Sequence, residues 1–248
     1  MARGYQPGFY ALSERVRDPV LRHRKAAKIA RAIVRHAGHP FSRAVCLDVG
    51  CSAGSVVQAV DAFCWLAVGL DYDYPALMAA DTATRASGRL IHGDAMNLPF
   101  SDNAVDVIVC AQIYEHVPDD ARLFQEIHRV LKPGGLVFFS GPNWLFPIEP
   151  HYLLPFLHWL PGSLADLYLR LTRKGDCYYE HSRHYWELRR LLAGFVIEDA
   201  SLEILWEMLA LDGSRGKEQI LRLVPQRLWR LLVPLFPNFN WILYKPAA

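Results

Sequence analysis

The sequence contains few cysteines, and their spacing excludes a disulfide framework. The 248-residue chain has five, Cys46, Cys51, Cys64, Cys110 and Cys177, with no CxxC pair. An odd and scattered set is typical of a protein from a reducing compartment. No apolar run approaches the roughly 18 residues that a membrane-spanning helix needs, and the N-terminus lacks a signal-peptide apolar region. We therefore expect a cytoplasmic protein.

Acidic residues are scarce near the N-terminus. Residues 1–43 carry ten Lys and Arg residues against only Glu14 and Asp18, although the whole chain has a net charge of +2. Asp18 and Pro19 are typical of a helix start and Gly38 of a helix end, so we predict an amphipathic basic helix over 19–37. We treat residues 1–43 as a basic helical segment that precedes a main domain over 44–248.

Short apolar runs then alternate with helical patterns. We predict strands over 44–47, 66–70, 89–92, 105–110 and 136–140, and helices over 55–63, 75–84 and 119–131. This alternation favours a parallel sheet with helices on both faces.

The alternation stops after residue 140. Residues 142–182 combine five prolines with many aromatic and leucine residues, and we interpret them as an inserted cap with short helices over 153–159 and 164–172. We expect a helix over 184–193, a strand over 195–205, a second basic helix over 217–235 and a last strand over 238–244.

The first predicted strand runs into a turn of small residues, Asp48-Val49-Gly50-Cys51-Ser52-Ala53-Gly54. Glycines allow a ligand to approach the backbone, and the helix start offers free N–H groups. The turn lacks the GxGxxG pattern of a dinucleotide fold, which argues against a nicotinamide-dependent oxidoreductase. Asp48 before the first glycine suits a cationic ligand such as an ammonium group.

Two further acids end the next two predicted strands. Asp71 follows the second strand, where a carboxylate can accept both hydroxyls of a ribose. Asp94 follows the third and can receive the exocyclic amine of a purine. Since ligands bind open α/β sheets at this edge, three acids at successive strand ends indicate one site.

With these residues the chain resembles the class I S-adenosylmethionine-dependent methyltransferases, of the kind that act on small molecules in quinone biosynthesis. The matching segments are Leu47 to Gly54, Asp71, Gly93-Asp94-Ala95 with Leu98-Pro99-Phe100, Asp102 to Ile108, Glu115 to Asp119, and Glu126 to Gly135. The resemblance implies a Rossmann-like fold with a seven-stranded, mostly parallel sheet whose last strand is reversed. It also implies S-adenosylmethionine as cofactor and S-adenosylhomocysteine as product. The family often has glycine where this chain has Ser52.

The resemblance assigns cofactor contacts to nine positions. They are Asp48, Gly50, Cys51, Gly54, Asp71, Tyr72, Asp94, Ala95 and Gln112. Of these, Asp48, Gly50 and Gly54 would frame the methionine part, Asp71 the ribose, and Asp94 with Ala95 the adenine.

The absence of several motifs limits the classes of methyl acceptor that we expect. No Asn-Pro-Pro-Tyr-like motif follows the fourth strand, which disfavours base-amino methylation, and Cys110 lacks the preceding proline expected for attack on cytosine. There is no Asp plus Asp-Asn set for a magnesium catechol site. We expect transfer to oxygen, with His116 or His151 as the base because histidine titrates near neutral pH.

Polar residues of the cap region are candidates for the acceptor site. They are Glu149, Tyr152, His181, His184 and Tyr185. We expect no metal centre, because His181 and His184 have no third ligand at suitable spacing. The cap's apolar residues, among them Leu153, Phe156, Trp159, Leu164 and Leu167, would form a lid over an apolar, aromatic or lipid-linked acceptor.

The sequence gives less information about binding partners other than the cofactor and the methyl acceptor. The two basic helices could contact an anionic membrane, at its inner face, or a phosphate-bearing substrate, or could serve solubility alone. The near-neutral net charge disfavours nucleic acid. The alternative function is a catalytically inactive methyltransferase-fold protein that acts as a peripheral membrane or scaffold partner. The sequence leaves the oligomeric state, the pathway and the acceptor open.

Overall fold

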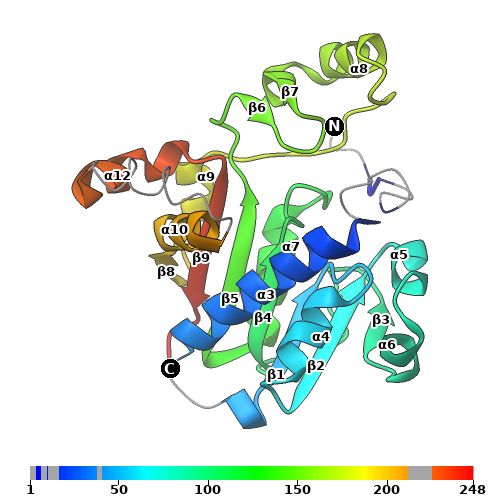
Figure 1. Ribbon diagram of the computed structural model, residues 1–248, viewed down its shortest axis with the longest axis vertical. Coiled ribbons are helices and arrows are strands. Elements are labelled where there is room, and N and C mark those ends of the chain that lie inside the picture. Colours follow the sequence, from blue (N-terminus) through cyan, green and yellow to red (C-terminus); the bar gives the residue numbers. More distant parts are fainter. Residues whose placement is uncertain (1–3, 7–9, 11–16, 38–40, 212–224, 248) are drawn as a thin grey trace.

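The computed structural model describes residues 4–6, 10, 17–37, 41–211 and 225–247. Its centre is a seven-stranded sheet in the order β3-β2-β1-β4-β5-β9-β8 (Figure 1). The strands are β1 (Val45–Val49), β2 (Leu66–Asp71), β3 (Leu90–His92), β4 (Val105–Ala111), β5 (Leu131–Pro142), β8 (Val196–Asp199) and β9 (Asn238–Tyr244). Only β9 runs against the others, antiparallel to β5 on one side and β8 on the other. The predicted sheet and its reversed last strand are confirmed.

Helices cover both faces of the sheet. The elements are α3 (Pro19–His36), η1 (Phe41–Arg43), α4 (Ser55–Asp61), α5 (Tyr74–Met78), α6 (Thr82–Ala86), α7 (Asp120–Val130), α9 (Tyr185–Leu191), α10 (Ser201–Leu211), α12 (Gln226–Leu232) and η3 (Val233–Leu235). One core cluster joins α3, α4 and α10 to the near face in Figure 1, and another joins α7 and α9 to the far face. Two separate apolar layers explain why the central strands are buried on both sides.

Helix α3 forms as the sequence predicts. The Asp18 side chain accepts from the amides of Val20 and Leu21 at its N-terminus, and Ile29 and Ile33 lie in the core. Gly38 and residues 217–224 of the second basic helix lie outside the described residues. Because α3 packs on α4 and on β5, the basic segment is continuous with the main fold.

The cap projects beyond the carboxyl ends of the strands (Figure 1). It consists of β6 (Ile148–Glu149), β7 (Leu154–Pro155), η2 (Leu157–Trp159) and α8 (Gly162–Leu171). Leu154, Leu157, Ala165 and Leu169 form its own small core. The predicted helix over 164–172 is confirmed as α8, whereas 153–159 is a short hairpin strand followed by a 3₁₀ turn.

Two other element predictions are wrong. The strand expected over 195–205 ends at Asp199, whose carboxylate accepts from the Ser201 amide and so helps to begin α10. Residues 201–211 are rich in Leu, Glu, Met and Ala, which favour helix. The helix expected over 75–84 is divided into α5 and α6, because Asp81 caps a new helix start.

None of the helices in the described part of the chain is both long and apolar enough to cross a membrane.

Candidate active site

A cavity of about 600 Å³ opens at the carboxyl ends of β1, β2 and β4. Nine of the predicted residues line it: Asp48, Gly50, Cys51, Asp71, Tyr72, Ala95, Gln112, His116 and His151. They come from five separate segments of the chain, so the fold brings together residues that are up to about a hundred positions apart in the sequence. Of the cap, Pro150 and His151 are the residues that reach this cavity.

The turn after β1 is shaped by left-handed backbone. Gly50 has φ +74°, and a Cβ there would lie 1.9 Å from the Ile113 side chain. Ser52 has φ +49°, a conformation that favours glycine, and its buried hydroxyl has no hydrogen-bond partner. Gly54, with φ +76°, caps α4 beneath the cavity and does not line it.

Asp48 and Lys25 both line the cavity. Asp48 is buried at the end of β1, and burial raises the pKa of its carboxyl group to about 8, with Lys25 opposing the rise and Asp71 adding to it. Lys25 extends from α3, and its Nζ donates to the Ala111 carbonyl at 3.2 Å. Arg22 and Lys28 of the same helix also line the cavity. The sequence analysis missed these inward-facing cations because it treated them as part of a solvated face.

Asp71 is held by backbone amides. Its two oxygens accept from the Ser52 amide at 2.7 Å and the Asp73 amide at 2.8 Å. Burial raises the pKa of Asp71, and these hydrogen bonds oppose the rise. Each carboxylate oxygen keeps a further acceptor position for a ligand hydroxyl.

Tyr5 occupies the surroundings of Asp94. Its ring stacks on Tyr72 with centroids 4.1 Å apart, and its hydroxyl donates to Asp94 Oδ1 at 2.7 Å. Burial and Asp94 raise the pKa of Tyr5, so the hydroxyl stays protonated. Asp94 also accepts from the Met96 amide, and Ala95 lies at the cavity wall. A ligand that stacks on this face of Tyr72 and bonds Asp94 Oδ1 must therefore displace Tyr5.

Gln112 lies at the end of β4 in a left-handed conformation, φ +66°. The backbone amide of Gln112 donates to the Ser140 carbonyl at 2.7 Å. The strained backbone directs this side chain into the cavity beside Ser140 and Asn238.

His116 and His151 meet at the cavity, with their rings edge to face at a centroid distance of 4.8 Å. Glu149 is fully buried and holds His151: it accepts from His151 Nδ1 at 2.7 Å and from the His151 amide at 2.8 Å. Glu149 also accepts from the Tyr152 amide at 2.7 Å. Glu149 therefore holds His151 in place. The sequence had instead predicted that Glu149 contacts the methyl acceptor.

Glu115 lies between the two imidazoles. Its fully buried Oε1 is 3.9 Å from His116 Nε2 and 3.8 Å from His151 Nε2, and neither carboxylate oxygen has a hydrogen-bond partner among the residues that the structure describes. Burial raises the pKa of Glu115 to about 7, against the charges of His151 and Lys25. The sequence had placed Glu115 only within the family motif.

The two histidines have opposite pKa shifts. Burial and the charge on His151 lower the pKa of His116 well below its usual value, so it is neutral at pH 7. Burial alone would lower the pKa of His151, but the hydrogen bond and charge of Glu149, with Glu180 and Glu115 nearby, raise it to about 9. The pair thus has one neutral ring, able to accept a proton, and one cationic ring.

The same three side chains are also a possible metal donor set. The ligand atoms of Glu115, His116 and His151 lie within 4.8 Å of one another. Glu149 contacts His151 Nδ1, so Nε2 of His151 is the atom that would face a metal ion, as in histidine ligands held by a carboxylate.

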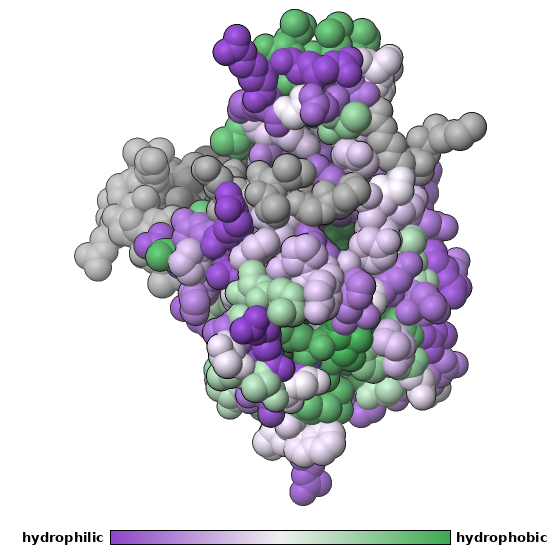
Figure 2. Space-filling model, turned by 90° about the vertical axis from the view of Figure 1, so that its right-hand side faces the viewer, coloured by the Kyte–Doolittle hydropathy of each residue, from purple (hydrophilic) through white to green (hydrophobic). Residues whose placement is uncertain are grey.

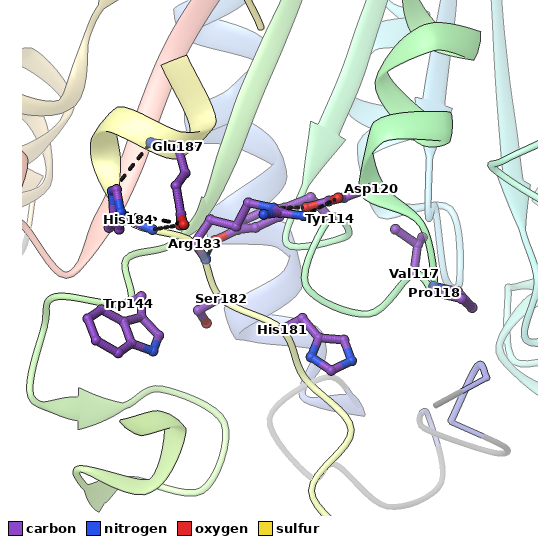
Figure 3. A pocket seen from close by; sticks show the side chains of 10 residues that line it. All are labelled: Tyr114, Val117, Pro118, Asp120, Trp144, His181, Ser182, Arg183, His184 and Glu187. Atoms are coloured by element: carbon purple, nitrogen blue, oxygen red, sulfur yellow. Dashed lines mark hydrogen bonds and ion pairs between the residues drawn. The ribbon is translucent and has the colours of Figure 1, made fainter. Parts of the chain in front are cut away.

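A second cavity, of about 610 Å³, lies beside the first (Figure 3). His181, Ser182, Arg183 and His184 form one wall, with Tyr114 and Trp144 around them. Arg183 is fixed by an ion pair to Asp120, and its amide donates to the Tyr114 hydroxyl. Val117 belongs to the walls of both cavities.

The remaining predicted acceptor residues divide between these environments. His184 lines the second cavity while capping α9, where its side chain accepts from the Glu187 amide. Tyr152 packs against Tyr178 within the cap. Tyr185 packs on the sheet core, 5.5 Å from Trp241 between ring centroids, and lines neither of these two cavities, so its role in the acceptor site stays a prediction. Its aromatic side chain packs in the hydrophobic core.

The predicted apolar lid is also wrong in its orientation. Leu153, Phe156, Trp159, Leu164 and Leu167 are exposed, and none of them lines either cavity. The cap's inward apolar positions are already filled by its own small core.

Comparison with known proteins finds similarity to methyltransferases over part of the chain. A methyltransferase domain model matches residues 47–139. An uncharacterized methyltransferase of Mycobacterium sp. (strain JLS) is 39% identical over 132 residues, which cover 53% of this chain and 51% of that protein. The chain thus spans about half the length of the curated relatives it matches.

Solved structures agree at the level of the fold. A chain of the complex between the Haloferax volcanii Trm112 methyltransferase activator and a methyltransferase is 16% identical, with a TM-score of 0.56 and coverage of 97% of this chain and 99% of that chain. An N-methyltransferase of Haemonchus contortus, solved with phosphomonomethylethanolamine and S-adenosylhomocysteine, is 21% identical, with a TM-score of 0.52 and coverage of 88% and 52%. Residues 47–139 are thus similar to a methyltransferase domain, and the chain shares its fold with these solved structures.

Proposed function

We propose that this chain is an active methyltransferase that transfers the methyl group of S-adenosylmethionine to a hydroxyl oxygen of an apolar, aromatic or lipid-linked acceptor. The observation that carries the proposal is the single cavity in which Asp48 and Asp71 lie at strand ends and the His116–His151 pair completes the wall. Carboxylates at strand ends suit the cofactor, and a neutral imidazole suits a proton acceptor.

The donor groups of the cavity fit the parts of the cofactor. Asp48 suits the ammonium group of the methionine part and Lys25 its carboxylate. Asp71 has free acceptor positions for the ribose hydroxyls, and Asp94 with Ala95 suits the adenine once Tyr5 has moved. When bound, the cofactor supplies a sulfonium-linked methyl group.

The chain's own contribution to the chemistry is positioning and proton transfer. In an in-line displacement the acceptor oxygen forms a bond to the methyl carbon, the carbon–sulfur bond breaks, and its electron pair stays on sulfur. The acceptor's proton passes to neutral His116. Glu115, 3.9 Å from His116 Nε2, stabilises the imidazolium that results, and Glu149 keeps His151 in place.

The acceptor is proposed to enter through the second cavity. Its wall combines Trp144 and Tyr114 with the polar side chains of His181 and His184, and Val117 connects it to the His116 side of the cofactor cavity. This mixture suits a molecule with an apolar body and a polar reacting end.

A second candidate function is the catalytically inactive protein. The observation that favours it is Tyr5, which fills the place beside Tyr72 and Asp94 where the adenine is expected. If this contact were permanent, the chain would keep the fold without binding the cofactor.

Methyl transfer from labelled S-adenosylmethionine tests both functions. The purified chain is incubated with the labelled cofactor and an extract of the native host, and label is counted in organic and aqueous phases. Label in the organic phase supports an apolar or lipid-linked acceptor, and label only in the aqueous phase contradicts it. The absence of label, together with no binding of S-adenosylhomocysteine, would favour the inactive protein.

A further inference from the structure

Helix α8 of the cap is apolar on the side that faces solvent. Leu164, Leu167 and Leu171 follow one another at spacings of three and four residues, and their exposed fractions are 49%, 45% and 73%. Residues at this spacing share one helix face. The opposite face already supplies Ala165 and Leu169 to the cap's core. A helix at the surface of a water-soluble domain normally has polar residues on its outer side.

The apolar face continues beyond α8. The rings of Phe156 and Trp159 lie 4.9 Å apart between centroids, and both side chains are exposed, as is Leu153. Figure 2 shows apolar residues gathered at this end of the molecule, next to strongly hydrophilic ones. We define these six residues, Leu153, Phe156, Trp159, Leu164, Leu167 and Leu171, as the cap face. Contiguous exposed apolar surface of this kind marks an interaction site.

The charges beside the cap face indicate what covers it. Arg170, Arg173 and Lys174 are exposed at the end of α8, whereas Asp176 is the one exposed acid in residues 148–176. The other acids there, Glu149 and Asp166, are buried and bonded within the cap. A second copy of the chain placed face to face would bring like charges together, which disfavours self-association. An anionic lipid surface matches both the leucines and the cations.

We propose that the cap face docks the protein on a membrane that contains anionic lipid, with the leucines of α8 and the ring of Trp159 in the interfacial region. The sequence had suggested membrane contact through the basic helices instead. In α3, however, Arg31 and Arg35 pair with Glu207 and Glu203 of α10, and Arg22, Lys25 and Lys28 face the cavity. The docking surface is therefore the outside of the same cap that carries His151.

Vesicle flotation tests this docking surface. The full chain is mixed with phosphatidylcholine vesicles that contain about one third phosphatidylglycerol, and with pure phosphatidylcholine vesicles as a comparison. We expect binding to the anionic vesicles, and at least a tenfold loss when Leu164, Leu167 and Leu171 are all replaced by Ser. Replacing Arg170 and Arg173 by Glu lowers binding to the anionic vesicles, with circular dichroism confirming that each variant is folded.

Two matched variants control for general loss of surface hydrophobicity. Phe63→Ser with Trp65→Ser removes exposed apolar residues between α4 and β2, and Leu228→Ser with Leu231→Ser removes those of α12. Both variants are expected to bind vesicles as the unmodified chain does. Loss in the α12 variant alone, no binding by the unmodified chain, or a dimer in light scattering that the α8 variant abolishes would overturn the proposal. The test is independent of methyl transfer, so it can fail or succeed separately from the proposed function.

Discussion

The part of the molecule around the first cavity, which we call the cofactor half, differs from the cap in how strictly the sequence determines the position of each side chain. Along β1, β2 and β4, buried strands end at fixed turns, and a one-residue shift would bury polar groups. In the cap, residues 142–182 have apolar side chains in nearly every direction, and only some can enter its small core. A recurrent backbone motif therefore predicts function more securely than an apolar composition does.

The catalytic pair connects these two regions, since His116 follows β4 and His151 belongs to the cap. Replacing His116 by Ala is expected to lower kcat by about 10²–10⁴-fold, the usual contribution of general acid–base catalysis, and replacing His151 by Ala is expected to lower kcat by less. Affinity for S-adenosylhomocysteine should stay within a factor of about two, measured by calorimetry. His23→Ala, at an exposed position of α3, is the control. Equal turnover in both variants and the control would remove the pair from the mechanism.

Replacing Tyr5 tests whether the structure must change before the cofactor half can bind its ligand. The stacking on Tyr72 and the bond to Asp94 must both be broken before adenine can take their place. Tyr5→Ala should therefore tighten binding of S-adenosylhomocysteine by about tenfold, the equivalent of one charge-assisted hydrogen bond. Calorimetry measures the change. Weaker binding in this variant would instead mean that Tyr5 packs on the bound cofactor.

Asp48 makes cofactor binding depend on pH. Its pKa is raised to about 8, so below this value the carboxyl group must lose a proton before it can pair with an ammonium group. Affinity for S-adenosylhomocysteine should rise from pH 6 to pH 8, by up to about tenfold for each pH unit, and level off above. Titrations at several pH values measure this slope. An unchanged slope in Asp48→Asn would assign the dependence to another group.

Replacing Ser52 by Gly is expected to give the smallest effect of these variants, a change in stability. Replacing it by Gly removes both the left-handed strain of a side chain at φ +49° and an unpaired buried hydroxyl. We expect unfolding to require about 1 kcal/mol more free energy, measured by urea denaturation. Gly50→Ala is the opposite case, because its Cβ would collide with Ile113, and it should destabilise the chain. A loss of stability in Ser52→Gly would contradict this account of the turn.

The sequence predicted the sheet and the grouping of Asp48, Gly50 and Asp71 at one cavity, because glycines and strand-end acids have local causes. It missed Tyr5, Lys25 and Glu115, since their importance depends on contacts between distant segments. It did not predict that Tyr185 packs on Trp241, because an aromatic residue suits a core as well as a pocket. The direction of the cap's leucines was wrong for the same reason: composition predicts burial in general but does not specify the partner.

The most direct test of the account is calorimetric titration of S-adenosylhomocysteine into the unmodified chain, Asp71→Ala and Asp61→Ala. Asp61 pairs with Arg89 away from the cavity and serves as the matched control. We predict that Asp71→Ala weakens binding by about tenfold to a hundredfold, as expected for the loss of hydrogen bonds to a carboxylate, and that Asp61→Ala leaves it unchanged. Equal affinity in all three would show that the strand-end acids do not bind the cofactor.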